Sequence, residues 1–205
     1  MANVDAPFGF SQYRGLAYAP TYEQVPVAIA YNASAIFYGD PVFPTAAGGV
    51  EKGTPGTDPI AGVFVGCKYL SVAQKRTVWS NYWPGSDVAS GNTVEGYIIN
   101  DPNARFVAQV SGSTSTGIGT DAVNNNVQFA YGTGNTANGI SGAYIVYNSV
   151  ADTATLPFKV VGILTDPPGS PGTPIAPDTA AAPGAYNRII VAFNNVTTRA
   201  GTLGV

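Results

Sequence analysis

The sequence predicts an all-β fold: an antiparallel β-sandwich of jelly-roll type, or a barrel, with an extended N-terminal arm and a proline-rich C-terminal connector. Apolar residues alternate in many short runs, and no stretch sustains the three-and-four spacing of an amphipathic helix over three turns. Gly, Pro and Asn separate these runs at regular intervals, which is typical of sandwiches and barrels. The 205 residues suit one large β domain, because such domains often exceed the usual size of about 150 residues.

Residues 1–24 are expected to form the arm. They show little periodicity but hold five aromatic residues, Phe8, Phe10, Tyr13, Tyr18 and Tyr22. Such a segment suggests an arm laid over another surface, either a neighbouring protein or the chain's own domain. The β core is expected over 25–165, and 166–205 would hold the connector and a final strand, which belongs to the same domain or to a neighbour's.

Two runs show strand alternation most clearly. The run at 25–31 places three β-branched residues and a tyrosine on one face, and Pro26 favours an edge position because proline cannot donate to a sheet ladder. The run at 104–110 indicates a sheet with one wetter face, because it sets Phe106, Ala108 and Val110 against Arg105, Val107 and Gln109.

Further strands are expected along the chain, and Asp-Pro turns end several of them. These strands lie at 35–39, 61–70, 76–83, 93–100, 126–131, 142–147, 156–164 and 187–195. Four aspartates directly precede prolines, at Asp40, Asp58, Asp101 and Asp166. An aspartate there can accept a hydrogen bond from the backbone two residues on while proline presets the turn, so these carboxylates are assigned a structural role.

The connector at 166–184 departs from the strand pattern. It holds six of the 16 prolines, so it cannot form a helix or a central strand. The apolar strand that follows at 187–195 either returns to its own sheet or adds to the sheet of a neighbouring copy. The return is favoured because long structured loops occur within single domains.

The charge content is low for a soluble domain. Charged residues make up 10% of the chain and hydrophobic residues 45%, whereas ordinary domains carry about 25% charged residues. Much of the surface must therefore be neutral, which suits permanent contact with copies of itself or with a partner. The net charge of −3 and the scattered basic residues argue against a nucleic-acid partner.

The residue content also narrows the possible chemistry. The chain has no histidine and one cysteine, so it lacks Ser-His or Cys-His nucleophile pairs and thiolate metal clusters. Cys67 is expected to be a small buried thiol. A hydrolase using Asp87 with Glu95 or Asp101 is conceivable but not favoured, and we expect no enzyme activity, cofactor or metal. No apolar run is long enough to span a membrane as a helix, and no secretory signal is evident, so cytoplasmic synthesis is expected.

The two tryptophans allow two interpretations of their role. On a continuous strand, Trp79 and Trp83 would share one face and could stack sugar rings. Alternatively, one or both fill the core or a contact between subunits, where tryptophan is enriched. The second interpretation is favoured because the sequence shows no charged or amide-rich neighbours around the pair, as a sugar site requires.

Several stretches together resemble a known family. The segments 2–10, 82–84, 99–110, 132–145, 153–163 and 187–195 occur in an order that resembles tailed-phage virion structural proteins of the capsid decoration, or cement, type. The resemblance spans nearly the whole chain. It departs at Ala104, Arg105 and Ala108, where relatives tend to carry a more acidic strand, so a charge-based contact there is not expected.

The resemblance implies a β-rich protein made in the host cytoplasm that binds the outer surface of the phage shell. Its partner would be the major capsid protein, and it would form homo-oligomers, commonly trimers and otherwise dimers, without contact to nucleic acid or membrane. Alternatives are a glycan-binding module on the virion surface, or a tail-tube or head-completion protein. The residues expected at the protein interface are Phe8, Phe10, Tyr13, Arg14, Trp79, Tyr82 and Trp83.

Overall fold

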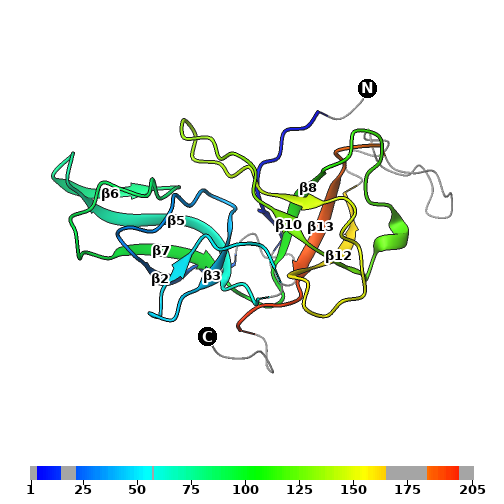
Figure 1. Ribbon diagram of the computed structural model, residues 1–205, viewed down its shortest axis with the longest axis horizontal. Helices are drawn as coiled ribbons and strands as arrows, with labels where there is room; N and C mark the ends of the chain where they lie inside the picture. The colour runs from blue at the N-terminus through cyan, green and yellow to red at the C-terminus, as the bar shows by residue number, and fades with distance from the viewer. Residues whose placement is uncertain (1–3, 15–21, 57, 165–183, 199–205) are drawn as a thin grey trace.

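The computed structural model describes residues 4–14, 22–56, 58–164 and 184–198, and they form an all-β protein (Figure 1). Two sheets lie side by side along the long axis of the molecule. A short 3₁₀ turn occurs at Thr120–Ala122. Within the described residues, no helix has the length and apolar character needed to cross a membrane. The predicted fold class is confirmed.

The first sheet closes on itself. It contains β2 (Val25–Ile29), β3 (Pro41–Pro44), β4 (Val50–Glu51), β5 (Gly62–Ser71) and β7 (Val94–Ile99). The strand order is β3-β4-β2-β7-β5, and β3 pairs again with the beginning of β5, which makes a five-stranded barrel. A sixth strand, β6 (Arg76–Ser80), pairs with the end of β5 outside this closed ring.

The length of β5 allows it to serve both the barrel and β6. Val63 pairs with Pro41 of β3, whereas the last five residues of β5 pair with β6, from Cys67 opposite Ser80 onward. The pairing register between β5 and β7 shifts between Phe64 and Gly66 of β5, which marks a bulge. A bulge bends a strand and increases its twist. The end of β5 can therefore leave the barrel and carry β6 away from it.

The second sheet also closes into a barrel, which is called the second barrel below. Its order is β10 (Phe129–Ala130), β11 (Tyr144–Val146), β8 (Arg105–Ser111), β13 (Arg188–Phe193), β12 (Phe158–Ile163) and β9 (Asn126–Val127), and β1 (Ser11–Arg14) pairs with β8. Only Gln128 separates β9 from β10, so the two ends of this order belong to one stretch of chain. Most pairings are antiparallel, and β11–β8 and β2–β4 are parallel.

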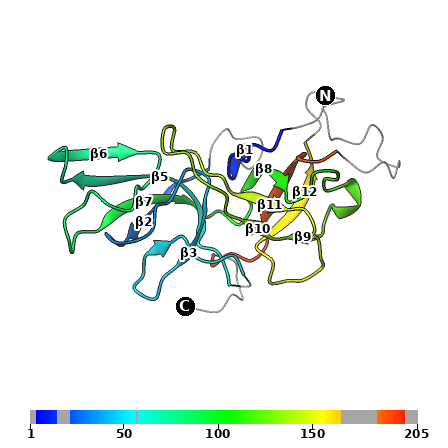
Figure 2. The same cartoon turned by 45° about the horizontal axis from the view of Figure 1, so that its top comes forward.

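Phenylalanines fill the second barrel, and one of them comes from the expected arm. Phe10 is 1% exposed and stacks on Phe158 at 4.3 Å between ring centroids, with Phe129 edge-on at 5.9 Å. The strand β1 that follows lies beside β8 (Figure 2). The prediction that Phe10 contacts a partner is therefore wrong, because its ring is buried in the chain's own core.

The sequence located most strands correctly. The alternation predicted at 25–31 matches the burial of β2, and the strand predicted at 104–110 is β8. The wetter face predicted for that strand is wrong at Gln109, which is 3% exposed because the N-terminal segment covers it: the Ala6 N–H donates to Gln109 Oε1 at 2.9 Å. The strand predicted at 35–39 is wrong: Ile36 and Tyr38 make only isolated bridges, and the chain turns at Gly39, where φ is +88°. Three short strands, β1, β3 and β4, were not predicted.

The final strand lies within its own chain's sheet. β13 pairs with β8 on one side and β12 on the other, as the predicted return requires. The predicted connector falls almost entirely on 165–183, which lie outside the described residues, and so do Tyr18 and Asp166. Asp101 accepts a hydrogen bond from the Asn103 N–H at 2.8 Å, which confirms the predicted turn.

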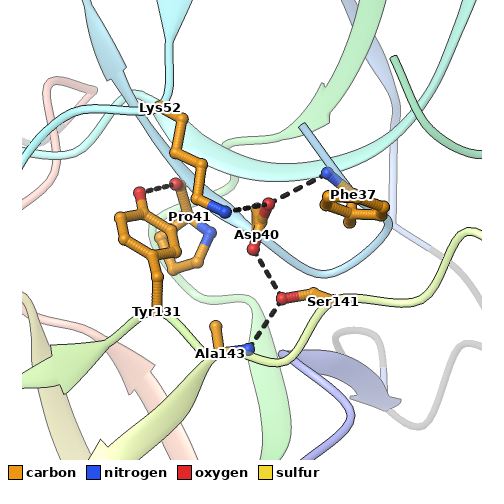
Figure 3. A network of polar contacts seen from close by, with 7 residues as sticks. All are labelled: Phe37, Asp40, Pro41, Lys52, Tyr131, Ser141 and Ala143. Carbon is orange, nitrogen blue, oxygen red and sulfur yellow. Dashed lines mark hydrogen bonds and ion pairs between the residues drawn. The ribbon is translucent and has the colours of Figure 1, made fainter. Parts of the chain in front are cut away.

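A buried carboxylate joins the two barrels (Figure 3). Asp40, which is 1% exposed, lies just before β3 in the first barrel. Its Oδ2 lies 3.3 Å from Lys52 Nζ and accepts a hydrogen bond from the Phe37 N–H at 2.9 Å. Its Oδ1 accepts a hydrogen bond from Ser141 Oγ, which precedes β11 of the second barrel, at 2.5 Å. Asp40 therefore connects the barrels and does not cap its own turn in the predicted way.

Four further contacts extend this junction. The Tyr131 hydroxyl donates to the Pro41 carbonyl at 2.5 Å, and burial raises the pKa of this hydroxyl. The Lys52 ammonium lies 4.4 Å from the centroid of the Tyr131 ring and 5.7 Å from that of Phe37. Ser141 Oγ also accepts from the Ala143 N–H at 2.8 Å. Every charge at the junction therefore has a partner, as buried charges require.

Replacing Phe10 by alanine should destabilise the fold. The change leaves a cavity against Phe129 and Phe158, and such truncations cost about 3–5 kcal/mol. Urea unfolding measures the free energy directly. Phe8→Ala is the control, because Phe8 is only half-buried. An equal loss in both variants would contradict the placement of Phe10.

Replacing Lys52 by methionine should also destabilise the fold, because it leaves the Asp40 carboxylate buried without its counter-ion. We expect a loss of roughly 2–3 kcal/mol, below the usual cost for a fully buried pair because two other donors remain. Asp40→Asn combined with Lys52→Met should lose less than the sum of the single changes. Lys159→Met, at an exposed lysine of β12, is the control for unfolding in urea. Additive effects would contradict the coupling.

Candidate interaction surface

The outer face of the first sheet carries Trp79, one of the residues that the sequence assigned to a protein interface. Trp79 of β6 pairs with Lys68 of β5, Lys68 pairs with Glu95 of β7, and Glu95 pairs with Ala28 of β2. Successive residues of a strand point to opposite faces, so directly paired residues share a face. These four side chains therefore form one row across the sheet.

Trp79 is 68% exposed and stacks on Tyr97 of β7. The ring centroids lie 5.9 Å apart with 10° between the ring planes, although β5 runs between the two strands. Neighbouring strands are about 4.8 Å apart, so the two rings must lean toward each other over β5. Gly66, the partner of Tyr97 on β5, lies close to the end of β6: a Cβ there would lie 3.0 Å from the Ser80 carbonyl oxygen. The glycine of the bulge thus permits the close approach of the Ser80 backbone at the end of β6.

An ion pair lies beside this aromatic pair. Lys68 Nζ is 2.7 Å from Glu95 Oε2 and 5.1 Å from the centroid of the Trp79 ring. The Tyr97 hydroxyl donates to Glu95 Oε1 at 2.5 Å. The hydrogen bond with Lys68 lowers the pKa of Glu95, and the same bond raises the pKa of Lys68. Because all three groups are open to solvent, the pair contributes little to stability and mainly orients the side chains.

A shallow groove of about 450 Å³ continues from this row across the same face. Its walls include Pro26 and Ala28 of β2, Leu70 of β5 and Thr77 of β6. Leu70 is 57% exposed, and Val72, just beyond β5, is 56% exposed. Apart from the Lys68–Glu95 pair, the groove is lined by neutral side chains.

The two tryptophans do not share a face, so the sugar site built from both, which the sequence did not favour, is wrong, and Trp83 fills the core as the favoured interpretation allowed. β6 ends at Ser80, and the alternation ends with it. Trp83 is fully buried in the core of the first barrel, where its Nε1 donates to the Ala33 carbonyl at 3.2 Å and Tyr69 packs edge-on. Its expected contact with a partner is also wrong for this reason.

The other expected interface residues are more enclosed than Trp79. Tyr82 is half-buried and stacks on Phe37 at 5.4 Å. Phe8 and Tyr13 are half-buried, and the Arg188 guanidinium lies 5.3 Å from the centroid of the Phe8 ring. Arg14 belongs to β1, and its side chain lies outside the described part of the structure. Of the predicted interface residues with a described side chain, Trp79 is the most open.

The carboxylates considered for hydrolysis have structural partners. Asp87 accepts hydrogen bonds from Ser71 Oγ at 2.5 Å and from the Ala73 N–H at 2.8 Å, and these bonds lower its pKa. Glu95 is held by Lys68, and Asp101 by its turn. Cys67 is buried as predicted, and burial raises the pKa of its thiol to about 12. Within the described residues, no cluster of acidic and cysteine side chains could hold a metal ion.

Comparisons with known protein families, with curated proteins and with solved structures each find no match to the chain. The function of the outer face must therefore follow from its residues and their geometry.

Acid should release the ion pair on this face. The pKa of Glu95 lies below its ordinary value of 4.5, so the pair is intact above that pH and is lost as the pH falls through the lowered value. Loss of the pair frees Lys68 beside the Trp79 ring, which should change Trp79 fluorescence. Glu95→Gln should abolish this acid transition, whereas the buried Trp83 gives a constant signal in both proteins. The same transition in Glu95→Gln would contradict the assignment.

Proposed function

We propose that the protein is a tailed-phage capsid decoration protein that binds the outside of the shell formed by the major capsid protein. The outer face of the first barrel is the contact surface, and the observation that carries the proposal is its exposed apolar character. Trp79, Leu70 and Val72 are each more than half exposed, and the Lys68–Glu95 pair beside them neutralises itself. Exposed apolar patches on soluble proteins mark contact sites.

The proposed role is mechanical. Packaged DNA presses outward on a shell, and a cement protein adds buried interface across the junctions between capsid subunits. Separating the subunits must then expose additional apolar area, at about 25 cal/mol per Å². Many copies in a symmetric array combine modest single contacts through avidity. The low charge of the chain suits this role, since few charged groups need to be desolvated on contact.

Trp79 contributes most to this contact. Its ring is held in place by Tyr97 on one side, so little side-chain freedom remains to be lost on binding. Tryptophan is also the residue type most enriched among residues whose truncation strongly weakens interfaces. Lys68 and Glu95 form a polar border beside the ring, where charges set the orientation of a partner more than its affinity.

A second candidate, a glycan-binding module on the virion surface, is favoured by one specific observation. The exposed Trp79 ring is bordered by Lys68, Glu95 and the Tyr97 hydroxyl, so polar groups frame it in a way the sequence did not indicate. A flat ring next to hydrogen-bonding groups is able to bind a sugar. This arrangement needs only Trp79 and is independent of Trp83.

Binding to expanded, undecorated capsids tests the first proposal. The purified protein should bind in a fixed copy ratio, and Trp79→Ala should weaken binding at least about 10-fold, as expected for a central interface residue. Val4→Ser, at an exposed residue near the second barrel, is the control and should bind normally. Failure to bind any capsid, or unchanged binding of Trp79→Ala, would overturn the proposal.

The same variants separate the alternatives. Binding to a glycan array that is lost in Trp79→Ala, while capsid attachment stays intact, would favour the glycan module. Immunogold labelling of virions distinguishes the shell from the tail, where a tail-tube or head-completion protein would lie.

A further inference from the structure

β6 presents an open sheet edge. It pairs with β5 on one side, and within the described residues no backbone group of Arg76–Ser80 bonds to any other strand or loop. In an antiparallel pair, alternate residues direct their N–H and C=O groups away from the partner strand. The far side of β6 therefore carries unpaired donors and acceptors. Figures 1 and 2 both show β6 at the periphery of the first sheet, with no other strand beyond it.

This edge lacks the features that normally prevent pairing with another strand. Edge strands are commonly protected by lysines, prolines, bulges or inward-pointing charges. β6 has the sequence RTVWS, with one charge at its first position, no proline and a regular register along β5. Thr77, Val78 and Trp79 are residue types that favour strands. The barrel next to it, by contrast, removes the edges of β3 and β5 by closure.

We propose that β6 pairs antiparallel with β6 of a second copy of this chain, about a two-fold axis through Val78. In this register Arg76 lies opposite Ser80 of the other copy, Thr77 opposite Trp79, and Val78 opposite Val78. No like charges face each other, and each contact occurs twice by symmetry.

The position of Trp79 on the outer face also supports a second copy of the chain as the partner of β6. Trp79 of each copy lies diagonal to Trp79 of the other on one face of the joined sheet, about 7–8 Å apart between backbones and within reach of aromatic side chains. Pairing would join the two outer faces into one surface twice as wide, with two Trp79–Tyr97 stacks near its centre. A second copy fits this edge because the five residues are complementary to themselves. The pairing does not depend on the proposed attachment to a shell.

Sedimentation equilibrium of the purified protein tests the pairing through a matched charge series. Ser80→Lys places a lysine opposite Arg76 of the other copy and should weaken dimerisation about 2- to 30-fold, since two symmetric like-charge contacts form. Ser80→Glu loses the same hydroxyl, which accepts from the Tyr82 N–H, but should dimerise at least as well as the wild type. Arg76→Glu combined with Ser80→Lys should restore dimerisation.

Hydrogen exchange locates the contact. Amides of β6 that point away from β5 should be protected at concentrations where the dimer forms and exchange freely on dilution. A protein that stays monomeric up to about 1 mM would overturn the proposal. It is equally overturned if Ser80→Lys and Ser80→Glu change dimerisation alike, or if the dimer leaves the β6 amides unprotected.

Discussion

The structure depends on satisfying one buried carboxylate, Asp40. A charge removed from water is tolerated only when it is paired and hydrogen-bonded, and Asp40 takes its partners from both barrels. The same junction holds the N-terminal segment, because the Phe10 N–H donates to the Gly39 carbonyl at 2.9 Å. A Cβ on Gly9 would lie only 2.7 Å from the Ser141 Cβ, so the backbone needs glycine there. The backbone at Gly9 can approach Ser141 this closely, and the next residue, Phe10, can therefore enter the core of the second barrel.

The outer face follows from the closure of the first barrel. Closure directs apolar side chains of β2, β5 and β7 inward, around Trp83, and leaves the Lys68–Glu95 pair and the exposed Leu70 on the outside. The bulge at Gly66 then releases the end of β5, which carries β6 and with it Trp79. The strand that pairs with β5 beyond this bulge thus carries both the exposed Trp79 and the open edge. The proposed capsid contact uses the outer face that carries Trp79. The proposed pairing of copies uses the open edge of β6.

The local pattern of apolar residues predicted most strands. The contacts between residues far apart in the chain could not be predicted from it. Alternation located β2 because burial on one face leaves a period of two, and it also located β8, although Gln109 on the other face of that strand is buried as well. It could not show that β3 pairs with both β4 and β5, or that the structure holds two closed sheets. The stack of Trp79 on Tyr97 was missed because it depends on strand order. Asp40 was assigned to its own turn because nothing nearby in the sequence indicates Ser141 as its partner.

In the proposed function, the outer face of the first barrel is covered by a neighbouring molecule of the phage shell. A cryo-electron microscopy reconstruction of shells carrying the protein tests it most directly. Density from the major capsid protein should cover the groove beside Leu70 and enclose the Trp79 ring. Density that leaves this face open to solvent, with attachment through the second barrel, would contradict it.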